Sequence, residues 1–175
     1  MAEEPTQGDI AARRERLVEG LRTYGGQHTE LSRGFAAWMG LHSTDAIGLL
    51  EIIGAEERGA PLSPARLGER IPLSSGATTA LLNRLEAAGH IVRTREHADR
   101  RIVTLHSSPH IQELADEFFG PLGVRVDALL TRYPPELLDR FDEFLREMCA
   151  TMNAHIVEVS QAGRRDQQGR PGRGD

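Results

Sequence analysis

Arginines gathered in the middle of the chain are the residues with the clearest chemistry. Between Arg58 and Leu105 the sequence holds eight arginines and four acidic residues, a net charge of +4 in a chain whose total is −5. Guanidinium groups bind phosphate oxygens through paired, charge-assisted hydrogen bonds. A basic segment within an acidic protein is typical of a compact nucleic-acid-binding module. A chance cluster of surface arginines is the alternative.

Two short helices are predicted to carry part of this segment. A hydroxyl at Ser63 followed by Pro64 is a signal for a helix start, and this helix is expected to stop near Pro72. Ser74 caps the next helix, and Gly89 ends it where a left-handed backbone is favoured. The inward face of this second helix is predicted to hold Ala77, Leu81, Leu85 and Ala88.

A hairpin is predicted after the two helices. The β-branched runs 91–95 and 102–105 flank the polar loop 96–101, which places arginines at the tip. Helix, tight turn, helix and hairpin is the order of a winged helix-turn-helix. The second helix of such a unit is narrow enough for the major groove of DNA, and the loop of the hairpin reaches the neighbouring minor groove.

Helices are also predicted before the basic segment. A heptad-like apolar stripe over residues 9–39 indicates one long helix, and Gly25 and Gly26 inside it predict a kink. Residues 42–45 offer an N-cap and a first-turn acid for a second helix. Its run 47–53 is apolar on nearly every side, so we expect this helix at the centre of the core.

Helical periodicity returns after the hairpin. A stripe over residues 111–129 predicts a helix with a bend at Gly120–Pro121, and another stripe predicts a last helix from Pro134 to Val159. The stripes of the first and last helices need a larger partner surface than one small core supplies, so we expect a homodimer. The alternative is that they fold back on their own subunit. Residues 163–175 have the composition of a disordered tail.

Three pieces of sequence carry a resemblance to a known family. They are Leu73-Ser74, the run Leu85 to Val92 and, above all, Asp99-Arg100-Arg101 followed by Val103 to Leu105. Through them the chain resembles the MarR family of bacterial transcription regulators, from about residue 42 to 105 and more loosely from 23 to 148. Each piece alone occurs freely in unrelated proteins, whereas the combination is specific.

The resemblance implies a mostly α fold: a winged helix-turn-helix, with a three-helix core and a two-stranded β-hairpin wing, flanked by N- and C-terminal dimerisation helices. The expected divisions are an N-terminal helix in 1–41, the winged unit in 42–106, C-terminal helices in 107–162 and the tail in 163–175. The resemblance also implies a dimer that presents its two winged units to a palindromic operator in double-stranded DNA.

The expected recognition helix departs from the family pattern, since small residues stand where relatives often have arginine or another polar residue. Its expected DNA-binding residues are Ser74, Ser75, Gly76, Ala77, Thr79, Asn83 and Arg84. Of these, Ser75, Thr79 and Asn83 are the hydrogen-bonding candidates, Ala77 suits a thymine methyl group and Arg84 suits a phosphate. Each small residue could equally be surface filler. Specificity is therefore expected to rely on DNA shape and on the wing.

In the wing, Asp99 lies two residues before Arg101, which resembles the Asp-x-Arg element of the family. The carboxylate would hold the guanidinium in one orientation, so Arg101 is the candidate for insertion into the minor groove, where negative potential is focused. An exposed ion pair of little energetic value is the alternative for Arg101. Arg95 and Arg100 are expected to contact the DNA backbone.

The resemblance also implies a possible small-molecule effector between the winged unit and the dimer helices. The residues expected near it are Tyr24, His28, Trp38 and His42. Residues of these types are more often part of a core than of a ligand site.

Other chemistries have little support. His106 and His110 are four apart, but 107–109 interrupt the helix that this spacing needs for a metal, so a structural role and no metal are expected. The lone Cys149 cannot form an intrachain disulfide and is expected to pack beside the stripe of the last helix. No phosphate-binding glycine loop or hydrolase motif occurs, so we expect no enzyme and no cofactor. The absence of a long apolar run indicates a cytoplasmic protein with no membrane partner.

Two functions from different classes remain. The first is a dimeric, sequence-specific DNA-binding transcription regulator, expected to be a repressor. The second is a winged-helix module that binds a protein partner and no longer binds DNA, which the acidic total charge and the arginine-poor recognition helix allow. The arginines of the wing favour the first.

Overall fold

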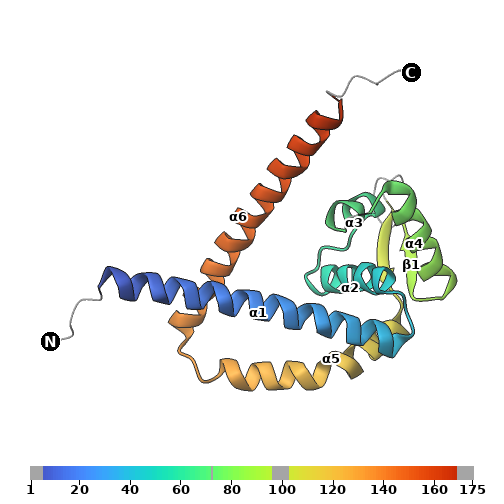
Figure 1. Cartoon of the computed structure of the whole chain (residues 1–175). Coiled ribbons are helices and arrows are strands. Elements are labelled where there is room, and N and C mark those ends of the chain that lie inside the picture. The colour runs from blue at the N-terminus through green and yellow to red at the C-terminus, as the bar shows by residue number, and fades with distance from the viewer. Residues whose placement is uncertain (1–5, 72, 96–102, 169–175) are drawn as a thin grey trace. The chain divides into compact units, whose positions relative to one another are not determined.

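The computed structural model describes residues 6–71, 73–95 and 103–168, with side chains as far as Val159. In chain order the elements are α1 (Gln7–Met39), α2 (Ser43–Glu57), α3 (Pro64–Arg70), α4 (Ser75–Ala87), β1 (Ile91–Thr94), β2 (Thr104–Ser107), α5 (Pro109–Leu130) and α6 (Pro135–Gln168) (Figure 1). They form two compact units, residues 1–119 and 120–175, and α5 begins in the first and ends in the second. The mostly α-helical fold with a two-stranded wing is confirmed.

The core of the first unit is built around α2, as its apolar run predicts. The buried residues of α2 include Ala46, Leu49, Ile52 and Ile53. The other elements contribute Phe35 from α1, Leu67 from α3, Leu81, Leu82 and Leu85 from α4, Ile91 and Leu105 from the hairpin, and Ile111 from α5. Gly48 sets the closest approach, since a Cβ atom there would lie 2.9 Å from Cδ2 of Leu81. Only glycine therefore lets α2 and α4 approach so closely without a shift.

Capping residues set the ends of the short helices as the sequence predicts. The hydroxyl of Ser63 accepts a hydrogen bond from the backbone N–H of Arg66, with Pro64 as the first helical residue. Ser74 is the N-cap of α4, and Gly89, with φ +70°, follows its end. The N-cap of α2 is His42, whose side chain makes no capping bond.

The inward face of α4 differs from the prediction. Ala77 and Ala88, expected to face the core, are exposed. The buried residues are Thr78, Leu81, Leu82 and Leu85. Their spacing of three, one and three is the stripe that an amphipathic helix buries, and Ala77 lies just outside it. Ala88 is the C-cap residue, so it lies just beyond the helix and is not part of its buried stripe.

The paired strands of the hairpin lie close to its base, and the second strand begins later in the sequence than predicted. β1 pairs antiparallel with β2, and Ile91 lies opposite Ser107 while Thr94 lies opposite Thr104. The predicted second strand, 102–105, is thus shifted by two residues. The backbone N–H of Leu105 also donates to the carbonyl oxygen of Leu62 at 2.8 Å, which fixes β2 against the segment before α3. The wing tip, residues 96–102, lies outside the described residues.

The long helices α1 and α5 each span the positions at which the sequence predicts a kink or a bend. α1 begins with a capping box between Thr6 and Asp9 and continues as helix through Gly25 and Gly26, and α5 contains Pro121 within its span. α6 continues to Gln168, so the prediction of a disordered tail is wrong for residues 163–168, because local hydrogen bonds extend a helix beyond its apolar stripe. None of the helices formed by the described residues is long and apolar enough to cross a membrane.

Candidate nucleic-acid interface

The exposed face of α4 holds the residues that the sequence assigns to DNA. The hydroxyl of Ser74, at the N-cap, accepts a hydrogen bond from the backbone N–H of Ala77 at 3.3 Å. The hydroxyl of Thr79 donates to the carbonyl oxygen of Ser75 at 2.9 Å, which leaves its lone pairs as acceptors. The exposed residues of α4 include Ser75, Gly76, Ala77, Thr79 and Asn83.

Arg84, the expected phosphate contact, is held by a buried carboxylate. Its Nε donates to Oδ2 of Asp45 at 3.0 Å and its Nη2 donates to Oδ1 at 2.6 Å, so the pair joins α4 to the first turn of α2. The Asp45 side chain is 6% exposed and the Arg84 side chain is 53% exposed. The hydrogen bond to Asp45 raises the pKa of Arg84 above its ordinary value. Arg84 thus has a structural partner while half of its side chain stays open to solvent.

A second contact, the Arg93 clamp, joins α4 to the hairpin. Nη2 of Arg93 donates to Oδ1 of Asn83 at 2.8 Å, and Nη1 lies 3.5 Å from Oε2 of Glu86. Sequence analysis identified Asn83 but missed its partner, because Arg93 stands in a β-branched run where no spacing points to α4. The clamp and the Asp45 pair together fix α4 against two different elements.

Among the described residues of the basic segment, several arginines form ion pairs. Those paired with a carboxylate are Arg66, Arg70, Arg84 and Arg93. Each pairing places a negative charge beside the guanidinium. Because Glu51 and Asp45 lie outside the basic segment, they further offset its positive charge at Arg70 and Arg84.

The wing residues are only partly covered by the structure. Arg95 follows β1 directly and is exposed. Asp99, Arg100 and Arg101 lie outside the described residues. The Asp-x-Arg arrangement and the minor-groove role of Arg101 stay predictions.

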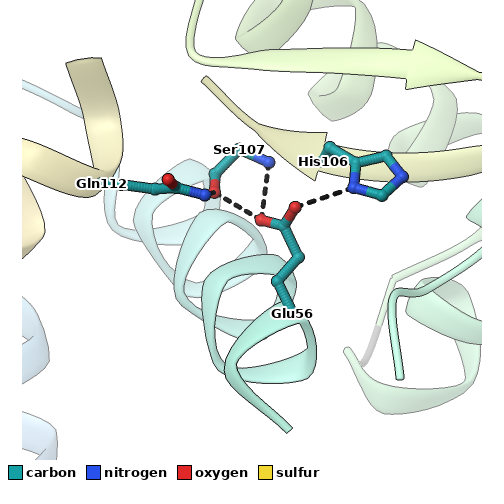
Figure 2. Close-up of polar contacts among 4 residues, drawn as sticks. All are labelled: Glu56, His106, Ser107 and Gln112. Atoms are coloured by element: carbon teal, nitrogen blue, oxygen red, sulfur yellow. Dashed lines mark hydrogen bonds and ion pairs between the residues drawn. The ribbon is translucent and has the colours of Figure 1, made fainter. Parts of the chain in front are cut away.

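A half-buried carboxylate fixes the base of the hairpin (Figure 2). Oε1 of Glu56, near the end of α2, lies 2.8 Å from Nδ1 of His106. Oε2 accepts hydrogen bonds from the backbone N–H of Ser107 at 2.8 Å and from its hydroxyl. Nε2 of Gln112 in turn donates to that hydroxyl at 3.2 Å. This network joins α2, β2 and α5, and it gives His106 a structural partner, as expected.

Asp45 and Glu56 share a signal that sequence analysis overlooked. Both fall on one helical stripe, with spacings of four, three and four: Asp45, Leu49, Ile52 and Glu56. The two apolar members are fully buried, so the stripe carries the acids at its ends into the same face. A carboxylate on the buried face of a helix requires a donor elsewhere in the fold. Here the donors come from α4 and β2.

A cavity of about 820 Å³ lies between α1, α2 and the first half of α5. Of the expected effector residues, only His28 is in its wall, together with Ile47, Leu50 and Phe119. Trp38 instead packs on Phe118, with ring centroids 5.5 Å apart. Tyr24 is exposed, and His42 caps α2. The structure therefore does not bring all four expected residues into the cavity wall: the ring of Tyr24 neighbours that of His28, with centroids 6.2 Å apart, whereas Trp38 and His42 lie elsewhere.

Two other expectations concern metals and the cysteine. Across the part of the chain that the structure describes, no three His, Cys, Asp or Glu residues gather so as to hold a metal ion. Cys149 is exposed, so the expectation that it packs beside the stripe is wrong for the single chain. The stripe itself is largely uncovered in α6, which explains the difference.

Comparisons with known proteins agree with this architecture. Residues 39–102 match the sequence model of the MarR family. YcgE of Bacillus subtilis, an uncharacterized HTH-type transcriptional regulator, is 28% identical over 148 residues, which are 82% of this chain and 91% of that protein.

Solved structures show the same fold. A MarR family protein from Bacillus stearothermophilus is 17% identical with a TM-score of 0.55, and the match covers 85% of this chain and 99% of that one. A mutant of MepR from Staphylococcus aureus is 12% identical with a TM-score of 0.60, and the match covers 78% of this chain and 96% of that one. At these identities the likeness concerns the fold alone.

Proposed function

The chain belongs to the MarR family of transcription regulators through its residues 39–102, and on this premise we propose that it is a dimeric, sequence-specific DNA-binding regulator that acts as a cytoplasmic repressor. Helix α4 enters the major groove of a pseudo-palindromic operator, and the wing enters the minor groove. The observation that carries the proposal is the exposed polar face of α4, whose opposite face is anchored in the core.

The polar face of α4 suits close contact with base edges. Ser75, Gly76 and Ala77 are small and exposed, so the helix backbone can approach the floor of the groove. Thr79 and Asn83, further along the helix, supply side-chain hydrogen-bonding groups. The Asp45 pair and the Arg93 clamp hold the helix rigidly, which reduces the entropy lost when DNA binds.

Uncovered apolar side chains support the dimer. Those on the second unit include Leu122, Val126, Leu129, Leu137, Phe141, Met152 and Ile156. Phe141 and Phe144 stack with ring centroids 6.5 Å apart, so an apolar surface is already assembled on α6. A two-fold dimer matches half-sites whose centres lie about one helical turn, roughly 10 bp, or a multiple of it apart.

The cavity beside α2 supports a small-molecule effector. Its wall includes residues of α2, and α2 is joined to α4 through Asp45 and to β2 through Glu56. A ligand that shifts α2 would therefore move both DNA-contacting elements. This route makes effector control of DNA binding part of the proposal.

Selection from a random duplex library, followed by titration of the selected duplex at two salt concentrations, tests the proposed function. We expect enrichment of a pseudo-palindrome and an affinity that falls steeply with salt, because phosphate contacts release counterions. Arg101→Ala is expected to weaken binding to all duplexes and to flatten the salt slope by about one unit per half-site. Arg132→Ala, which removes the same charge from the turn after α5, is the control.

Thr79→Ala is expected to behave differently from the wing variant. It leaves phosphate contacts intact, so it should lose about 1 kcal/mol on the selected operator and little on random DNA. If no duplex is enriched and binding to DNA shows no salt dependence, the proposal is wrong and the protein-binding winged module becomes the better account.

A further inference from the structure

Arg93 reaches α4 because of its place in the hairpin. It lies opposite Leu105 in the register of the sheet, so the two side chains project from the same face. Leu105 is fully buried in the core. The Arg93 side chain is accordingly 29% exposed, and its charged end lies at the edge of the core beside α4.

Two neighbouring residues of α4 receive the guanidinium. Asn83 and Glu86 are three apart, which makes them neighbours on one side of the helix. Nη2 of Arg93 binds the amide of Asn83 at 2.8 Å while Nη1 lies 3.5 Å from the carboxylate of Glu86. Both ends of the guanidinium are engaged, so turning it away from Asn83 would break two contacts.

The chemistry of the pair fixes which way the amide of Asn83 faces. A guanidinium carries N–H donors and no acceptor, so the amide atom against it must be the oxygen. The reversed amide would set an NH₂ group against a cation with no acceptor between them. The NH₂ group of Asn83 is therefore the part directed away from Arg93, on a residue that is exposed.

The orientation restricts which base Asn83 can recognise. An asparagine with both amide atoms available reads adenine by donating to N7 and accepting from the N6 amino group. Here the oxygen already accepts a hydrogen bond from a cation, so one of its two lone pairs is occupied and it is a weaker acceptor for the N6 amino group, while the NH₂ donors stay fully available. Guanine offers two acceptors, O6 and N7, to these donors in the major groove and thymine offers O4, whereas adenine offers N7 beside an amino group that itself requires an acceptor.

We propose that Asn83 is a specificity-determining residue and Arg93 its positioning residue: together they make α4 favour guanine or thymine over adenine at one operator position. This inference rests on the proposed function, because it concerns a contact that α4 makes with DNA. It assigns to Arg93, a residue of the hairpin, a role in base recognition without any contact between Arg93 and DNA.

Selection from the same random library with the full-length wild type and three variants tests the inference. The position read by Asn83 is the one where base preference disappears in Asn83→Ala. In the wild type we expect guanine or thymine there, favoured about fivefold over the other bases, which corresponds to one hydrogen bond of about 1 kcal/mol.

The other variants change the chemistry that Asn83 offers. Asn83→Asp keeps an oxygen against Arg93 and replaces the outward NH₂ with an acceptor, so the preference should switch to cytosine or adenine, whose amino groups donate. Arg93→Met keeps the length of the side chain but removes its donors, which frees the amide to turn. The discrimination against adenine should then weaken at the same position.

Arg66→Met is the matched control, since Arg66 pairs with Glu69 within α3 and, among the described residues, forms no ion pair or hydrogen bond with α4. It should leave the base preference unchanged. Circular dichroism checks that each variant folds, and should Arg93→Met fail to fold, the switch expected of Asn83→Asp still decides the matter.

Three outcomes would overturn the inference. One is a wild-type preference for adenine at the position that depends on Asn83. Another is an Asn83→Asp variant that keeps the wild-type preference, and the third is a uniform loss of affinity for all sequences in Asn83→Ala, which would mean a phosphate contact. Failure of the wild type to enrich any duplex would instead contradict the proposed function itself.

Discussion

Helices α2 and α6 both carry apolar stripes, but only the stripe of α2 is covered within the chain. Seven of the 15 residues of α2 are buried, whereas none of the described side chains of α6 is. Phe141 is 47% exposed and Ile156 is 57% exposed. α2 has α1, α3, α4 and β2 around it. A stripe thus shows that a helix face needs a partner, and the fold alone shows whether the partner is in the same chain.

Charges placed in the uncovered stripe of α6 should have the largest effect. The double variant Phe141→Asp, Phe144→Asp puts two carboxylates into the apolar interface of the proposed dimer, so we expect this dimer to dissociate entirely at micromolar concentration. Sedimentation or light scattering measures this. Glu143→Ala, a change at a neighbouring polar position of α6, should leave the dimer intact. A wild-type protein that is monomeric under these conditions would contradict the dimer.

Truncating one leucine in each stripe sharpens the comparison. Leu49→Ala opens a cavity in the core around α2, so the free energy of unfolding should fall by about 2–5 kcal/mol at any protein concentration. If the chain forms the proposed dimer, the effect of Leu137→Ala should depend on protein concentration. Urea denaturation at two protein concentrations measures both. An effect of Leu137→Ala that is independent of concentration would mean that α6 is covered within its own subunit.

Two glycine substitutions should change the free energy of unfolding in opposite directions. Gly48→Ala places a Cβ atom 2.9 Å from Cδ2 of the buried Leu81, and this overpacking should cost about 1–3 kcal/mol of unfolding free energy. A Cβ atom at Gly20, in α1, meets nothing within 4 Å. Gly20→Ala should stabilise the protein by up to about 1 kcal/mol, since alanine favours helix. Thermal unfolding distinguishes them, and equal effects would argue against tight α2–α4 packing.

The smallest expected effect is the pH dependence of His90, at the start of the hairpin. Burial, and secondly the charge of His110, hold the pKa of His90 below its ordinary value. The unfolded chain therefore binds this proton more readily, and the stability that His90 contributes is lost as the pH falls below about 6.5. Between pH 7.5 and 5.5, His90→Asn should lose less stability than the wild type. His155→Asn, on α6, is the control, and an identical pH profile for His90→Asn and the wild type would refute the argument.

Much of the fold could be predicted because its signals are local. The caps at Ser63 and Ser74 and the left-handed Gly89 satisfy backbone groups with atoms a few residues away. The prediction failed where position depends on a distant neighbour. The hairpin is shifted by two residues where β2 also contacts Leu62, and the face of α4 is set by the elements that cover it.

The candidate site was predictable in its residue types and not in its contacts. Sequence alone indicated that Thr79, Asn83 and Arg84 lie in a recognition helix with polar groups to offer. It did not indicate that Arg84 would be held by Asp45 or Asn83 by Arg93. Nor did it indicate that only His28 of the four expected effector residues would line the cavity, because the walls of a cavity come from several elements.

The sequence by itself determined where the short helices α3 and α4 begin and end, which stretches carry apolar stripes and where arginines gather. These properties follow from hydrogen bonds and periodicities that span a few residues. Only the tertiary structure decided how the polar side chains are paired. Asp45 and Arg84 are 39 residues apart, and Glu56 and Ser107 are 51 residues apart. A buried carboxylate requires a donor but does not specify it, since the donor is whichever group the folded chain places within hydrogen-bonding distance.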